Sequence, residues 1–192
     1  MAFDIDKVRA AISNGTPPFE LRKIGHVVFK VTDLERSVAF YTGVLGFKVS
    51  DIFEKDIMPE GMVFLRCNPD HHGIALVGGA AGPTQRREFH HMAFELGSLD
   101  EVFRARKHLR EAGATITFEG RRRAGVQVAV EFLDPDGYTL ELYWGIDQIG
   151  TDGYVRPPEE WRDARTLEAA VANPPPGQTP VLHDVSLLER AK

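Results

Sequence analysis

The amino-acid sequence predicts an α+β fold built from two paired βαβββ modules that form an open barrel. Three observations lead to this prediction. Two segments 65 residues apart, 24–31 and 89–96, each place a histidine before an alternating apolar run. A helical pattern follows each segment, and each copy later holds a Pro-Asp turn that leads into another strand. Two copies of a unit of about 60 residues are the most economical explanation.

The first element of each unit is a predicted strand. IGHVVFKV (24–31) and FHHMAFEL (89–96) alternate apolar and polar residues, as a half-buried β-strand does. When the two segments are aligned, His26 falls on His91. The same side chain therefore leads the first strand of both units.

The second element of each unit is a predicted helix. Asp33 stands before the helical pattern of the first unit and Ser98 before that of the second, and both residue types are good N-caps. The patterns run into Gly46 and Gly113, where glycine adopts the left-handed conformation that commonly ends a helix.

The last strands of each unit follow a turn signature. CNPDHHGIALVGG (67–79) aligns with LDPDGYTLELYWG (133–145), so that Pro69 and Pro135 are 66 residues apart. The units span residues 24–83 and 84–146. Residues 1–23 form an N-terminal extension with apolar residues at helical spacing, and residues 147–192 form a C-terminal extension, all within one compact domain.

The C-terminal extension is predicted to hold a helix from Trp161 to about Val171, followed by the proline-rich segment NPPPGQTP. The extension is too apolar and too varied in composition for simple disorder. We expect it to wrap around the domain or around a partner subunit.

Composition limits the function classes. The chain has 192 residues, 43% hydrophobic and 27% charged, with a net charge of −5, which disfavours a nucleic-acid partner. No apolar run approaches the roughly 20 residues that span a bilayer, and the N-terminus does not resemble a secretory signal, so a cytoplasmic location is expected. The single cysteine, Cys67, excludes an intramolecular disulfide and cysteine-based metal clusters, so any metal ligands would be His and carboxylate.

The repeat predicts a metal site. Duplicated units bring equivalent positions together about a pseudo-twofold axis, so His26 and His91 should converge. The last strand of the second unit carries Glu141 where the first unit has Ala75. A carboxylate on a buried strand face is costly unless it is paired or binds a metal. Two imidazoles and one carboxylate, with open coordination positions, suit non-haem Fe(II).

Simpler explanations exist for each ligand taken alone. A single strand histidine is more often a packed core residue, and Glu141 could be a solvated acid on an edge strand. The metal site is favoured because three ligand-type residues fall at matching points of a repeat. The alignment selects His91 over its neighbour, and His90 should then face the opposite side or support the site from behind.

The motifs HVVFKVTDLERSVAFYTGVLGF, HHMAFEL and LDPDGYTLELYW resemble the vicinal oxygen chelate superfamily, which includes glyoxalases, bleomycin-resistance proteins and extradiol dioxygenases. The resemblance covers about residues 22–146. It implies paired βαβββ modules around a metal, with His26, His91 and Glu141 as the ligands. Glyoxalase-type members supply a fourth ligand at the position of Ala75, so the sequence is most similar to one-domain extradiol dioxygenases.

The same resemblance implies the remaining roles. FLRCNPDHHGIALVGG matches a dioxygenase segment in which His72 is the acid/base residue, with His71 as the neighbouring alternative. The larger enzymes of that class have four modules, place a tyrosine where this chain has Glu131, and carry a histidine in the preceding loop. Here that loop reads GRRRAGVQ, so substrate orientation and protonation must differ.

The implied activity is Fe(II)-dependent extradiol cleavage of a small aromatic diol by O2, in a homo-oligomer of two or more subunits. One alternative is a glyoxalase-like isomerase, epimerase or lyase that acts through an enediolate with Mn, Zn or Ni. A metal-free protein that binds a flat apolar compound is the third possibility. The run Arg121–Arg123 is best explained as a solvated loop, although one arginine could meet an anionic group on the substrate.

Overall fold

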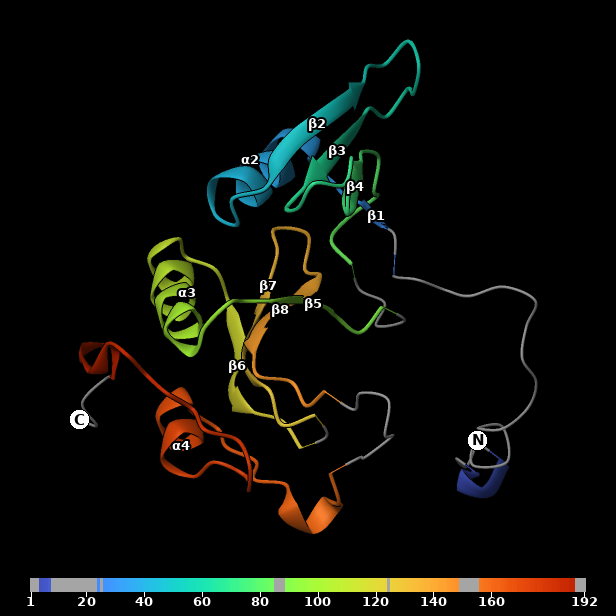
Figure 1. The fold of residues 1–192 in the computed structure, drawn as a ribbon. Coiled ribbons are helices and arrows are strands. Elements are labelled where there is room, and N and C mark those ends of the chain that lie inside the picture. The colour runs from blue at the N-terminus through green and yellow to red at the C-terminus, as the bar shows by residue number, and fades with distance from the viewer. Residues whose placement is uncertain are drawn as a thin grey trace.

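The computed structural model describes residues 4–7, 24, 26–84, 89–123, 125–148 and 156–188. In this part of the chain, two four-stranded mixed sheets each carry a helix, and the C-terminal segment lies beyond the second sheet (Figure 1). The α+β prediction with two βαβββ units is confirmed. The sheets do not join into a closed barrel.

The first module has the strand order β1-β4-β3-β2, in which β1 pairs parallel with β4 and the other pairs are antiparallel. Its elements are β1 (Val27–Lys30), α2 (Leu34–Gly43), β2 (Lys48–Phe53), β3 (Met62–Arg66) and β4 (Ile74–Val77).

The second module repeats this topology with the order β5-β8-β7-β6, and β5 pairs parallel with β8. Its elements are β5 (Met92–Glu95), α3 (Leu99–Glu111), β6 (Ile116–Arg121), β7 (Val128–Leu133) and β8 (Thr139–Trp144).

Strand register confirms the alignment of the two copies. Val28 pairs with Ala75 in the first sheet, and Ala93 pairs with Glu141 in the second. These pairs preserve the offsets of 65 and 66 residues that the sequence predicted. Glu141 and Ala75 are therefore structurally equivalent positions.

Helix starts and stops also follow the sequence. The Asp33 carboxylate accepts from the Arg36 amide at 2.9 Å, and Ser98 forms a capping box with Glu101. Gly46 and Gly113 have φ values of 75° and 74°, where a side chain would be strained. These local signals fix the length and direction of both helices.

Each sheet has one core face and one open face. In the first sheet Phe29, Leu65 and Leu76 alternate onto the core face, and in the second sheet Val130 and Leu140 do so. The intervening residues lie on the open face. Because the strand period is two, the face opposite the core is the one that carries Ala75 and Glu141.

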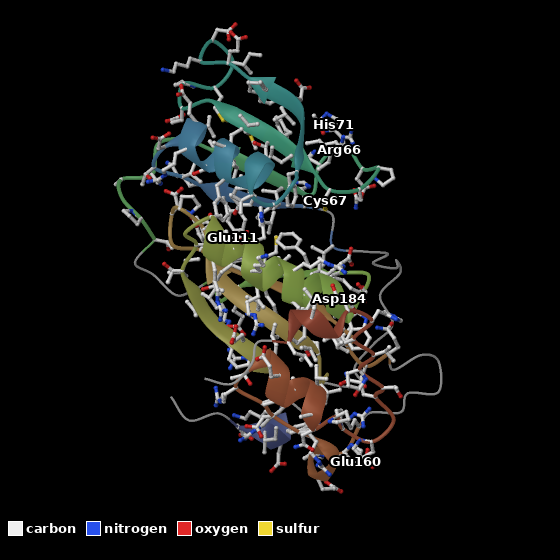
Figure 2. All side chains as sticks on the ribbon, turned by 90° about the vertical axis from the view of Figure 1, so that its left-hand side faces the viewer. Arg66, Cys67, His71, Glu111, Glu160 and Asp184 are labelled. Carbon is white, nitrogen blue, oxygen red and sulfur yellow. The ribbon has the colours of Figure 1, made fainter. Side chains whose placement is uncertain are left out.

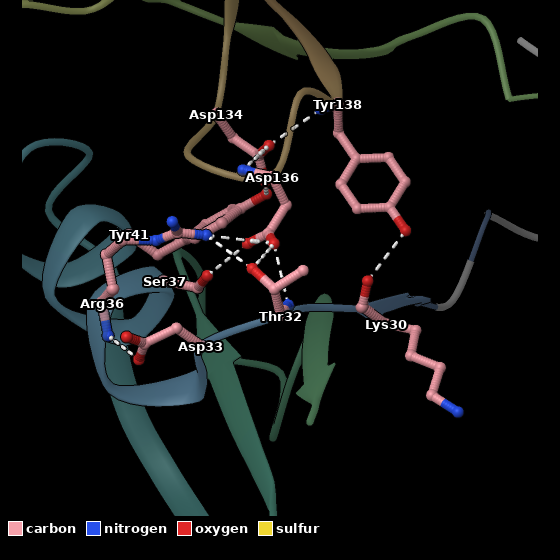
Figure 3. Close-up of polar contacts among 9 residues, drawn as sticks. All are labelled: Lys30, Thr32, Asp33, Arg36, Ser37, Tyr41, Asp134, Asp136 and Tyr138. Atoms are coloured by element: carbon pink, nitrogen blue, oxygen red, sulfur yellow. Dashed lines mark hydrogen bonds and ion pairs between the residues drawn. The ribbon is translucent and has the colours of Figure 1, made fainter. Parts of the chain in front are cut away.

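A buried turn of the second module joins the two modules (Figure 3). Asp136, in the turn between β7 and β8, accepts from the Thr32 amide at 2.8 Å, the Thr32 hydroxyl at 2.6 Å and the Ser37 hydroxyl at 2.6 Å. The Arg36 guanidinium lies 3.1 Å from the same carboxylate. Asp136 thus binds residues at the start of α2 from the other module.

Asp134 in the same turn binds the Tyr41 hydroxyl, which donates to its carboxylate at 3.0 Å (Figure 3). Burial raises the pKa of Asp134. Burial and the nearby Asp134 charge also raise the pKa of Tyr41. Burial would raise the pKa of Asp136 too, but hydrogen bonds from Ser37 and Thr32 outweigh it and lower that pKa.

The C-terminal segment packs on the second module, on the side away from the first (Figures 1 and 2). The expected helix from Trp161 to about Val171 is wrong at its start, because α4 (Leu167–Ala172) begins six residues later. A short 3-10 helix, η1 (Pro158–Glu160), precedes it. Between them Ala164 forms a β-bridge with Arg121, which requires extended backbone. The extension wraps its own domain, as one of the two expectations had it.

The C-terminal segment 156–188, called the tail below, approaches β6 closely because of a glycine in that strand. Gly120 has φ +129°, and a Cβ there would lie 2.2 Å from the Ala164 carbonyl oxygen. Only glycine lets the two backbones meet at this point.

The N-terminal extension lies largely outside the described residues, apart from Asp4–Lys7. Within the described ranges, no helix is long and apolar enough to cross a membrane.

Replacing Asp136 by asparagine should lower the free energy of unfolding at pH 7 by about 2 kcal/mol, because the charged acceptor of three buried or partly buried hydrogen bonds is lost. The folded pKa of Asp136 lies below its unfolded value, so its contribution is present above about pH 4 and disappears as pH falls through the folded pKa. Urea denaturation at pH 7 and pH 3 measures both. A difference between wild type and variant that did not shrink at low pH would contradict this assignment.

The substitution Gly120→Ala should detach the tail and cost more than about 1 kcal/mol, because it combines a positive φ with a backbone clash. Hydrogen exchange in α4 should accelerate. Gly43→Ala is the matched control, since a Cβ there meets nothing within 4 Å, and it should leave α4 protected. Unchanged protection in the Gly120 variant would disprove the role of this contact.

Candidate functional site

The candidate site lies on the open face of the second sheet. Along β8, Leu140 is buried in the core, so its neighbour Glu141 lies on the opposite face. Glu141 stands between Ala93 of β5 and Glu131 of β7, and its residue is only 1% exposed. A nearly buried carboxylate on this face requires partners.

Among the described residues, Glu141 has two such partners. His91 Nε2 lies 3.2 Å from one carboxylate oxygen, and Gln127 Nε2 donates to the other at 3.4 Å. Burial raises the pKa of Glu141, whereas His91 and Gln127 act in the opposite direction. The carboxylate and one imidazole of the predicted ligand set therefore converge.

His90 adjoins this pair. Its Nδ1 lies 2.6 Å from Nδ1 of His91, so one of the two rings must donate and the other accept. His90 also borders a cavity of about 650 Å³ on the same side of the module. Besides His90, the cavity is lined by Thr84, Phe89, Thr117, Arg122, Glu131, Leu133, Gly137, Tyr138 and Thr139.

The other two predicted residues meet on the first module. The rings of His26 and His72 are 4.6 Å apart, and Phe64 lies against His72 at 5.0 Å. Burial lowers the pKa of His72, and His26 and His71 lower it further. His71 instead lies 3.8 Å from Asp51. Of the two adjacent histidines, His72 is thus the one beside a predicted ligand.

The structure therefore gathers the predicted residues as two pairs, His91 with Glu141 and His26 with His72. Among the described residues, no group of three or more His, Cys, Asp or Glu side chains is placed to hold one metal ion. The triad stays a prediction. Its donor types fit a divalent cation, and Ala75, fully buried, supplies no fourth donor.

The three consecutive arginines have three different environments. Arg121 lies in β6 with 1% exposure, so the interpretation of a solvated loop is wrong for this residue. Arg123 lies 3.7 Å from Asp163 in the exposed tail. Arg122 forms an ion pair with Glu131 at 2.6 Å, and its guanidinium stacks 3.7 Å from the centre of the Phe118 ring.

Sequence reasoning missed Gln127 and the pairing of Arg122 with Glu131. A signal was available, because Gln127, Ala129 and Glu131 are spaced by two along one strand direction and so share a face. Glu131 and Glu141 are direct cross-strand partners. Once Glu141 is placed on the open face, Gln127 follows.

Comparison with known proteins agrees with this architecture. The sequence model of the Glyoxalase/Bleomycin resistance protein/Dioxygenase superfamily matches residues 23–142, which is more than half of the chain. The chain belongs to this superfamily. The match covers both modules and leaves out almost all of the two terminal extensions.

Two relatives are similar to this chain in sequence, and one solved structure is similar to it in fold. It is 43% identical over 125 residues to a biphenyl-2,3-diol 1,2-dioxygenase of Pseudomonas sp. (strain KKS102), with 64% of this chain and 41% of the relative covered. It is 30% identical over 122 residues to the lactoylglutathione lyase of Salmonella typhimurium, with 61% and 88% covered. A fosfomycin resistance protein of Listeria monocytogenes has a similar fold, with a TM-score of 0.56, 21% identity, and 66% and 95% coverage.

The two relatives differ in how much of their own length the alignment with this chain covers. The aligned region spans about two fifths of the dioxygenase but most of the lyase. Sequence identity is higher with the dioxygenase, whereas the aligned region makes up nearly the whole of the lyase.

Proposed function

We propose that this chain is an Fe(II)-dependent extradiol dioxygenase that cleaves a catechol-type aromatic diol with O2. The observation that carries the proposal is the nearly buried Glu141 with His91 on its carboxylate, on the open face of the second sheet. The 43% identity to a biphenyl-2,3-diol 1,2-dioxygenase supports the choice of reaction.

The proposed ligands are His26, His91 and Glu141. Bound there, Fe(II) supplies the redox chemistry and the open positions that a diol and O2 need. Among the described residues, the Glu141 carboxylate is contacted by His91 and by the neutral amide of Gln127. A cation would satisfy this carboxylate better than a neutral amide does.

His72 is the proposed acid/base residue. Its pKa is lowered by burial and by two neighbouring imidazoles, so the ring is neutral at pH 7 and can accept a proton from a substrate hydroxyl. Its contact with His26 places it beside a proposed ligand. His71 faces Asp51 and does not share this position.

The cavity bordered by His90 and by Glu131, the cross-strand partner of Glu141, suits an aromatic ring. Its walls combine aromatic side chains, Phe89 and Tyr138, with the Arg122–Glu131 ion pair. The pair replaces the tyrosine of the larger enzymes that the sequence resembles. We propose that it orients polar groups of the substrate, with Arg122 held flat by Phe118.

The second candidate is a metal-dependent isomerase, epimerase or lyase that uses Mn, Zn or Ni. The similarity to a lactoylglutathione lyase, 88% of which is aligned with this chain, favours it. The buried Ala75 disfavours it, because it removes the fourth donor expected of a glyoxalase-type site. A metal-free binding protein is the least favoured, since it has no need of the buried Glu141.

Metal analysis of anaerobically purified protein, followed by O2 uptake with a panel of catechols, separates these functions. We expect iron, O2 consumption and a yellow ring-opened product. Zinc, nickel or manganese with no O2 uptake would favour the second candidate, and protein without metal would favour a binder. Oligomeric state and cytoplasmic location stay predictions.

Substitution of the ligands tests the site itself. Glu141→Ala and His91→Ala should each weaken Fe(II) binding by more than roughly 100-fold, since even an outer partner is worth 10–100-fold. His90→Ala should cost no more than about tenfold, because His90 contacts the proposed ligand His91 and is not itself a proposed ligand.

Anaerobic titration of apo-protein against a chromophoric chelator measures these affinities. Equal losses in all three variants would mean that the wrong histidine was chosen or that the site is not a triad.

A further inference from the structure

The side chain of Gln178, in the tail, connects three parts of the second module. Its amide nitrogen donates to the Val126 carbonyl at 3.1 Å and to the Gly145 carbonyl at 2.9 Å. Its amide oxygen accepts from Arg121 Nη2 at 3.0 Å. One tail residue thus joins the end of β6, the loop before β7 and the end of β8.

Arg121 fixes the tail segment from which Gln178 projects. Its guanidinium donates to the carbonyls of Ala170 at 2.6 Å and Asn173 at 2.7 Å, and more weakly to Arg162 at 3.4 Å. Together with Gln178 these acceptors bind both terminal nitrogens of a buried cation, which would otherwise be costly, while its Nε has no hydrogen-bond partner among the described residues. The tail is therefore held in register with β6 by specific contacts.

The loop that Gln178 holds has an unfavourable backbone. Val126 has φ +49° and is fully buried, and a β-branched residue rarely adopts this conformation. Such a conformation persists where surrounding contacts enforce it. Here the contacts are Gln178 on the Val126 carbonyl and the Asp147 amide on the Gly125 carbonyl at 2.9 Å.

The residue after this strained position is Gln127, which donates to Glu141. The loop conformation therefore decides whether the amide of Gln127 reaches the carboxylate. We propose that Gln178 is a positioning residue: the tail holds the 125–127 loop so that Gln127 orients Glu141 for metal binding. This inference rests on the proposed function in that Glu141 is taken as a metal ligand.

A purely structural role for Gln178, as an anchor of the tail, is the competing explanation. Gln178→Glu separates the two. The glutamate keeps an acceptor for Arg121, now as an ion pair, so the tail stays docked. It loses both donors to the loop and to Gly145, and places a carboxylate oxygen against two carbonyl oxygens.

The decisive experiment is anaerobic Fe(II) titration of the full chain, with hydrogen exchange measured on the same samples. Gln178→Glu should bind Fe(II) about tenfold more weakly or worse, the effect expected of an outer partner. Exchange should accelerate in residues 125–128 and at the Asp147 amide, while α4 stays protected. Wild-type Fe(II) affinity and wild-type loop exchange in this variant would overturn the proposal.

A double-mutant cycle tests the route through Gln127. Gln127→Leu should weaken Fe(II) binding to a similar degree, and adding Gln178→Glu should weaken it little further, because both act through one contact. Additive losses would overturn the proposed route. Asp100→Asn is the matched control, since Asp100 binds the His183 and Asp184 amides elsewhere in the tail. It should leave Fe(II) affinity unchanged.

The exchange data also separate this proposal from the proposed function. If the wild type binds no Fe(II), the proposed function fails, and loop exchange alone decides the role of Gln178. Faster exchange of the loop with a docked α4 would then still support the positioning role, and unchanged exchange would remove it.

Discussion

The structure depends on one buried contact, the seating of the Asp134–Asp136 turn against the start of α2. Three hydrogen bonds from Thr32 and Ser37 converge on the Asp136 carboxylate, and the Arg36 guanidinium lies 3.1 Å from it. The contact joins segments about a hundred residues apart and orients one sheet relative to the other. A site that draws ligands from both modules can form only if this orientation is fixed.

The duplication is symmetric in strand order and asymmetric in its contacts. In the first module the equivalent turn, Asn68-Pro69-Asp70, is exposed, and the Asn68 side chain accepts from the Asp70 amide at 2.9 Å. The start of α3 meets the tail instead, where amides of His183 and Asp184 donate to Asp100 and lower its pKa. The tail thus packs against the start of α3, which the described part of the first module does not contact in the way that the second module contacts α2 (Figure 2).

Local signals in the sequence predicted the strands, caps and turns because these depend on neighbours along the chain. His26, His91 and Glu141 could be singled out because a repeat makes equivalent positions visible, whereas His72 was singled out from the resemblance to extradiol dioxygenases. The start of α4 could not be predicted, since the bridge between Ala164 and Arg121 competes with helix formation and is set by tertiary packing. Burial of an arginine by backbone carbonyls has no local pattern, so Arg121 was misread as a solvated residue.

The difference between Ala75 and Glu141 explains why the proposed carboxylate ligand comes from the second module alone. Both positions are buried at the same point of the repeat, but only one carries a charge that must be compensated. The second module accordingly surrounds Glu141 with polar groups: His91, Gln127 and, across the strand, the Arg122–Glu131 pair. The tail contacts fall on this module as well. In the first module the strand is apolar at this position. In the second module, neighbouring polar residues compensate a buried carboxylate that is the proposed ligand for a cation.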